Sequence, residues 1–204
     1  MRIIYVARLY PIEYLTIRFL SKLVGKLGGD LMVLGGDYTP DPSVLSRLLR
    51  GREVIVVPGD EDDVAITKIS RDLGILCSGN IREFRELSIA CIGGIDFMQD
   101  LKKVTKELSN TKVTNLLIIT HYPPINQLSI GLKYRLLNAG VKELLTMCSS
   151  ALATLCTHVS SNFVKLLNSD SLIIGLSGSY NGWCIIIDVS KSKELVIRYI
   201  RLLP

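Results

Sequence analysis

The stretch LLIITHYPP, residues 116–124, combines the features that decide the fold. Its first four residues form an apolar run of strand length, and this run ends at Thr120 and His121. The prolines at 123 and 124 then force an extended loop, because proline and the residue before it avoid helical backbone. The stretch therefore predicts a buried strand with a polar residue just beyond its end.

The same arrangement recurs in LMVLGGD (31–37), VIVVPGDED (54–62) and ALATLCTHVS (151–160). Apolar runs of this kind alternate with segments of helical period, which is typical of an α/β domain. Strands are expected at residues 2–7, 31–34, 54–57, 89–92, 116–119, 151–156, 171–176, 183–189 and 194–201. Helices are expected at residues 12–27, 42–50, 62–73, 98–108 and 131–147.

The last part of the chain contains consecutive strands with no helix between them. We therefore expect mixed sheets with antiparallel strands at the C-terminus. The chain has 204 residues, of which 48% are hydrophobic, and it shows no repeat, linker or low-complexity segment. These values exclude disorder and predict a single domain over residues 1–204 with a sizeable core.

The formal net charge is +5, but the basic residues form no run longer than a pair. Nucleic-acid binding is therefore not expected, because it calls for a basic stripe with interleaved aromatic residues.

The uncharged stretches 144–164 and 171–187 are interrupted by polar residues or glycines. They are interpreted as buried core segments and not as membrane spans.

The five cysteines, Cys77, Cys91, Cys148, Cys156 and Cys184, are odd in number and form no CxxC motif. This pattern predicts buried thiols in a reducing compartment, neither a disulfide framework nor a thiolate zinc cluster.

The N-terminal apolar stretch is short and has no small-residue cleavage site, so it reads as a strand and not as a signal peptide. A cytoplasmic location is expected.

Polar side chains follow the predicted strands, at the sheet edge where ligands collect in α/β folds. Two carboxylates and two imidazoles stand there: Asp37, Asp60, His121 and His158. This set suits one first-row divalent ion such as zinc, iron or manganese. Each residue alone has a simpler interpretation, since Gly-Gly-Asp is commonly a turn or cap, residues 60–63 suit a first helical turn, and a lone histidine is often a core residue.

The whole chain resembles the calcineurin-like metallophosphoesterase superfamily. That family has five blocks at strand ends, D-x-H, G-D, G-N-H-(D/E), T-H-x-P-P and G-H-x-H. They correspond in order to Arg8-Leu9-Tyr10, Gly36-Asp37, Gly59-Asp60-Glu61-Asp62, Thr120-His121-Tyr122-Pro123-Pro124 and Thr157-His158-Val159-Ser160. Ile92-Gly93-Gly94 and Ser177-Gly178-Ser179 also look like family landmarks. The resemblance implies an α/β fold of the metallophosphoesterase type, an αββα sandwich.

The resemblance also implies that one of the family's two metal sites is lost. Three positions of the first site are occupied by Arg8, Tyr10 and Ser160, which replace an aspartate and two histidines. The second site would keep four residues able to bind metal: Asp37, Asp60, His121 and His158. If Cys156-Thr157-His158 is instead aligned with the final H-x-H, Cys156 belongs to the kept site and His158 to the lost one.

Two catalytic roles follow from the resemblance. A guanidinium at Arg8 can pair with Asp37 or hold a phosphate through two hydrogen bonds, but it does not acidify bound water as a metal does. The family's third-block histidine, thought to protonate the leaving oxygen, corresponds to Glu61. A carboxyl group can act as the acid there only if burial or neighbouring carboxylates raise its pKa.

Three functions are consistent with this sequence. The first is a non-catalytic or weakly active binding module, a pseudoenzyme whose partner is a protein or a phosphate-containing ligand. The second is a mononuclear metal-dependent phosphoesterase that acts on a phosphomonoester or phosphodiester. The third is a metal-free protein in which Arg8 and the acidic residues form a salt-bridge network. The first is preferred, and whether the protein is an enzyme stays open.

Overall fold

The computed structural model describes residues 1–8, 27–37, 53–124, 138–179, 183–192 and 194–201. The predicted helices at 12–27 and 42–50 lie outside these residues, apart from residue 27, as does the first part of the helix predicted at 131–147. The chain forms two compact units. We call Met1–Leu76 with Gly178–Pro204 the terminal unit, and Cys77–Ser177 the central unit. The single domain expected over 1–204 stays a prediction.

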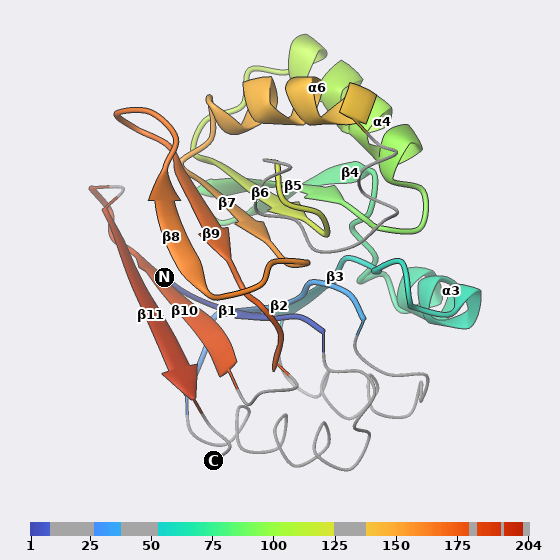
Figure 1. Cartoon of the computed structure of the whole chain (residues 1–204), viewed down its shortest axis with the longest axis horizontal. Coiled ribbons are helices and arrows are strands. Elements are labelled where there is room, and N and C mark those ends of the chain that lie inside the picture. The colour runs from blue at the N-terminus through green and yellow to red at the C-terminus, as the bar shows by residue number, and fades with distance from the viewer. Residues whose placement is uncertain (9–26, 38–52, 125–137, 180–182, 193, 202–204) are drawn as a thin grey trace. The chain divides into compact units, whose positions relative to one another are not determined.

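The terminal unit is built on a five-stranded mixed sheet of order β11-β10-β1-β2-β3 (Figure 1). Its strands β1, β2 and β3 are parallel, whereas β10 pairs antiparallel with β1 and with β11. This pairing confirms the antiparallel strands expected at the C-terminus. The bounds are β1 Arg2–Val6, β2 Leu31–Leu34, β3 Glu53–Val56, β10 Trp183–Val189 and β11 Leu195–Arg201.

Strands β1 and β2 owe their position to apolar side chains at successive positions, which suit a strand buried on both faces. Residues 3–6 are fully buried, and all four residues of β2 are buried. Helix α3 (Val64–Asp72) follows β3 and begins where the Asp63 carboxylate accepts a hydrogen bond from the Ala65 amide at 2.9 Å. This capping explains why the helix starts two residues later than the predicted residue 62.

The central unit has a six-stranded mixed sheet of order β4-β5-β6-β7-β9-β8 (Figure 1). Its four inner strands are parallel, and the edge strands β4 and β8 are antiparallel to their neighbours. The bounds are β4 Asn80–Phe84, β5 Leu87–Ile92, β6 Leu116–Thr120, β7 Ala153–Cys156, β8 Phe163–Leu166 and β9 Leu172–Gly175.

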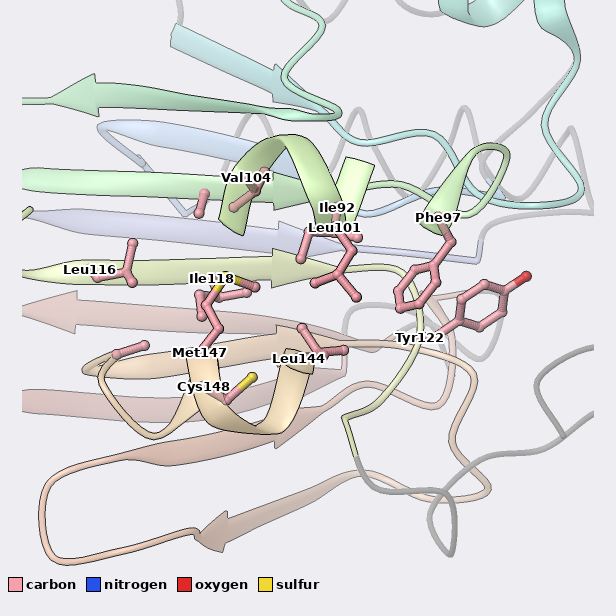
Figure 2. Packing of buried hydrophobic residues seen from close by; sticks show 12 residues of the cluster. Ile92, Phe97, Leu101, Val104, Leu116, Ile118, Tyr122, Leu144, Met147 and Cys148 are labelled. Atoms are coloured by element: carbon pink, nitrogen blue, oxygen red, sulfur yellow. The ribbon is translucent and has the colours of Figure 1, made fainter. Parts of the chain in front are cut away.

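Helices α4 (Phe97–Asn110) and α6 (Asn138–Cys148) lie along one face of this sheet (Figure 1). Leu101 and Val104 of α4 and Leu144 of α6 pack with Ile92 and Ile118 of the sheet (Figure 2). These five side chains are fully buried. The core of the central unit therefore lies between its helices and its sheet.

One interpretation from the sequence is wrong. Cys77 and Cys91 form a disulfide, so not all five cysteines are thiols. The turn before β4 brings the two residues together, because the Gly79 amide donates to the Cys91 carbonyl at 2.9 Å. In the uncharged stretch 144–164, most apolar residues are buried as expected, and Val164 at its end is 47% exposed on the edge strand β8. Within the described ranges, no helix combines the length and apolarity that a membrane span requires.

Candidate metal-ligating residues

The loop after β2 places Asp37 through two glycines with different roles. A side chain at Gly35 would meet the Tyr5 ring, because its Cβ would lie 2.5 Å from the Tyr5 hydroxyl oxygen. Gly36 has a φ of 97°, and Asp37 itself has a φ of 54°. The chain therefore turns sharply at this point, and the Asp37 side chain is buried, with only 5% of it exposed.

Asp37 is joined to the loop after β3 by hydrogen bonds in both directions. Its Oδ1 accepts from the Glu61 amide at 3.1 Å, and its own amide donates to Asp62 Oδ2 at 2.9 Å. The Gly59 amide donates to the same Asp62 oxygen at 2.7 Å. In this loop Asp60 is half-buried and Glu61 is exposed. The acid role expected for Glu61 stays a prediction.

Arg8 stands beside Asp37 within the terminal unit. The Arg8 amide donates to the Gly36 carbonyl at 2.7 Å, and its Nε lies 3.9 Å from Asp37 Oδ2. The salt-bridge hypothesis predicts contact of Arg8 with Asp37 or Asp60, and the contact with Asp37 is present. About a quarter of the Arg8 side chain, 24%, is exposed. Tyr10, the other replaced position of the first block, lies outside the described residues.

In the central unit, the parallel register of β6 and β7 brings the two histidines together. Thr120 pairs with Cys156, and one residue further the Thr157 amide donates to the His121 carbonyl at 3.2 Å. The rings of His121 and His158 consequently lie 4.5 Å apart between centroids, at 69°. His121 is fully buried and His158 is half-buried.

Tyr122 completes the aromatic surroundings of the histidines. Its ring centroid lies 5.0 Å from that of His121 and 5.2 Å from that of His158. It also makes an edge contact with Phe97, with ring centroids 5.4 Å apart, at one end of the buried cluster (Figure 2). Tyr122 is 3% exposed. Packing of this kind restricts the orientations available to both imidazoles.

Cys156 has different surroundings from His158. Its thiol donates to the Ile174 carbonyl, with the sulfur 3.6 Å from the oxygen, inside the sheet. Complete burial raises the pKa of Cys156 far above its ordinary value. The Cys156 thiol is thus bonded to a carbonyl within the sheet, whereas the His158 ring lies beside that of His121. Ser160, the replaced position of the final block, is exposed.

Left-handed backbone occurs at several of the predicted site residues. Among the described residues, Arg8, Asp37 and His158 have φ between 52° and 57°, and the other non-glycine residues with positive φ are Arg85 and Asn115. Such backbone is unfavourable for residues with a Cβ and is often retained at functional sites. The sequence contained no signal for this feature, and it also gave no role to Asp62 as the acceptor for two loop amides.

No family model matches the chain, and no curated protein matches it. The solved structures that are similar to it in fold include the following three. The protein TT1561 of Thermus thermophilus has 15% sequence identity and a TM-score of 0.70, with 97% of both chains covered. A dimetal phosphatase from Danio rerio has 12% identity and a TM-score of 0.58, with 98% of this chain and 95% of that one covered.

The third structure is GAP50, described as the anchor in the inner membrane complex of Plasmodium. It has 11% identity and a TM-score of 0.64, with 98% of this chain and 84% of that one covered. Together with the two mixed sheets, these likenesses confirm the metallophosphoesterase-like fold expected from the sequence. At such low identity they establish the fold alone.

Proposed function

We propose that this protein is a metallophosphoesterase-fold binding module with a degenerate site, non-catalytic or weakly active, that holds one divalent metal ion. The ligands would be Asp37, Asp60, His121 and His158, each of which offers one ligand atom. Two carboxylate oxygens and two imidazole nitrogens suit zinc, manganese or iron. The close pair of buried and half-buried imidazoles supports this ligand set over one that uses Cys156.

The observation that carries the degenerate character is the ion pair between Arg8 and Asp37. According to the family resemblance, Arg8 occupies the position of an aspartate ligand of the lost first metal site. A guanidinium beside Asp37 repels a second cation there and supplies a permanent positive charge. One divalent ion and Arg8 would together bind a phosphate group, while the acidity that two ions give to a bridging water would be missing.

Metal analysis tests the proposal directly. The full-length chain, purified without added metal or chelator, is expected to carry about one equivalent of zinc, manganese or iron, as a single mononuclear site requires. His121→Ala is expected to abolish this content. Asp170→Asn is the control, because Asp170 is an exposed carboxylate of the central unit that the proposed ligand set does not include. Wild-type protein with no bound metal, which also takes up none in a calorimetric titration, would refute the proposal.

A mononuclear phosphoesterase is the alternative function, and the partial exposure of the Arg8 guanidinium side chain favours it. A guanidinium that is partly open to solvent suits contact with a phosphomonoester or phosphodiester. The alternative requires metal-dependent turnover of an aryl phosphate that Asp37→Asn suppresses, with Asp170→Asn as the control. Absence of turnover with zinc, manganese or iron would leave the binding module as the function. A protein partner and a cytoplasmic location remain part of the proposal.

A further inference from the structure

The carboxylate of Asp62 links two loops of the terminal unit. A single oxygen, Oδ2, accepts hydrogen bonds from the Asp37 amide at 2.9 Å and from the Gly59 amide at 2.7 Å. These amides belong to the loops that carry Asp37 and Asp60. Asp62 is half-buried and precedes α3, whose cap is Asp63. Its Oδ2 is therefore bonded to the two loops, whereas the N-cap of the helix is the neighbouring Asp63.

The backbone at Asp37 explains why such an acceptor matters. Gly36 and Asp37 have φ values of 97° and 54°, so two successive residues have positive φ. This geometry is unfavourable for aspartate unless the surroundings hold it in place. An acceptor on the Asp37 amide stabilises the turn, because a backbone amide in a buried position is costly to leave without a hydrogen bond.

We infer that Asp62 is a positioning residue that fixes the Asp37 carboxylate for metal binding, an inference that rests on the proposed function. The link is reciprocal, because Asp37 Oδ1 accepts from the Glu61 amide in the Asp62 loop at 3.1 Å. Loss of the Asp62 acceptor would release the Asp37 amide and with it the orientation of the ligand side chain. Groups that orient metal ligands in this way affect the affinity without touching the ion.

Asp63 provides a matched control next in the chain. It is exposed, carries the same charge, and accepts from the Ala65 amide at 2.9 Å within its own helix. Its substitution removes an acidic side chain and one amide acceptor without touching the loop of Asp37. A difference between variants at 62 and 63 therefore reports the link between the loops and not the loss of charge.

Isothermal titration of the metal-free full-length chain with zinc tests the inference. Asp62→Ala is expected to weaken zinc binding about 10- to 100-fold, the range typical of groups that orient metal ligands. Asp63→Ala is expected to bind zinc as the wild type does, although it melts at a lower temperature through its lost helix cap. Asp62→Asn should restore most of the affinity, because one amide oxygen can accept from both backbone amides.

The outcomes separate this inference from the proposed function. Wild-type protein that binds no zinc refutes the proposed function and the positioning role together. Wild-type protein that binds zinc, with equal affinity in Asp62→Ala, overturns the positioning role alone. Failure of Asp62→Asn to restore affinity also overturns it, since charge would then be the cause. If Asp62→Ala does not fold, Asp62→Ser takes its place, because its shorter hydroxyl does not reach both amides.

Discussion

At the scale of single residues, His158 combines a proposed ligand with unfavourable backbone geometry. Its φ of 57° lies in the left-handed region, which residues with a Cβ adopt at a cost. The residue lies just beyond β7, and hydrogen bonds hold the loop around it. Thr157 Oγ1 donates to the Leu176 carbonyl at 3.0 Å, and Asn162 Oδ1 accepts from the Ser177 amide at 2.9 Å. These hydrogen bonds fix residues that flank His158 in the chain.

Two substitutions at this position separate the backbone from the imidazole. His158→Gly and His158→Ala both remove the ring, but glycine adopts positive φ without strain. We expect the glycine variant to be more stable than the alanine variant by about 1 kcal/mol in urea unfolding without metal. Neither variant should bind zinc as the wild type does. An alanine variant as stable as the glycine variant would contradict the left-handed backbone.

At the scale of elements, a buried carboxylate attaches α4 to its sheet. Asp100, in the first turn of α4, accepts from the Gly93 amide at 3.0 Å and from the Ser78 hydroxyl. Burial raises the pKa of Asp100, an effect that these hydrogen bonds partly offset. The side chain also lies against Gly79, whose Cβ, if present, would be 2.5 Å from Asp100 Oδ1. The helix, the turn before β4 and the loop after β5 thus share one carboxylate.

Substitution of this carboxylate should destabilise the protein more than loss of a neighbouring one. Asp100→Ala leaves the buried Gly93 amide without its acceptor, which we expect to cost about 2 kcal/mol of the free energy of unfolding. Asp96→Ala is the control, because Asp96 is exposed at the N-cap of α4 and makes no capping hydrogen bond. Chemical denaturation measures both. Equal effects of the two substitutions would mean that the Gly93 contact contributes nothing.

The elements that the sequence predicted best are strands with a continuous or alternating apolar pattern. Strand β2 matches the predicted 31–34, and β3 and β6 each differ from their predictions by one residue or less at each end. The edge strands β4 and β8 were missed, because their sequences NIREF and FVKL have partly or fully exposed side chains and lack an apolar run. Edge position alone does not explain this, because β3 and β11 also lie at the ends of their sheet and were predicted to within one residue at each end.

The candidate site was also predicted only in part. The positions of Asp37 and His121 just after buried strands were readable from the sequence, since strand ends position loop residues. The role of Asp62 was not, because an acidic residue before a helix also suits its first turn. The Cys77–Cys91 disulfide was also not readable from the sequence, because it depends on a turn and a strand pairing that the spacing of the cysteines does not encode. Contacts that depend on register or positive φ appear only in three dimensions.

At the scale of the whole molecule, buried thiols make stability depend on pH. Burial raises the pKa of Cys148 and of Cys184 to about 12 from an ordinary value of 9.0. Unfolded thiols ionise from about pH 9 upward, whereas the folded ones keep their protons. The contribution of each thiol to stability is therefore complete below pH 9 and is lost progressively as the pH rises toward 12.

Cys184→Ala should remove one of these pH-dependent contributions. Between pH 9 and 11, the difference in free energy of unfolding between wild type and variant should shift in favour of the variant by about 1 kcal/mol per pH unit. Between pH 7 and 8 the difference should stay constant. Urea unfolding at each pH measures it. A difference that does not vary up to pH 11 would show that this thiol ionises equally readily in the folded and unfolded chain.

The topology of the terminal unit also governs the order in which the protein can assemble during translation. Strand β1 lies between β2 and β10, and β10 comes from residues 183–189. The nascent chain therefore exposes one flank of β1 until the ribosome has released β10. The central unit is a continuous segment, Cys77–Ser177, and all of its strands emerge before that moment. During translation, the central unit should consequently fold first, and the sheet of the terminal unit should be completed last.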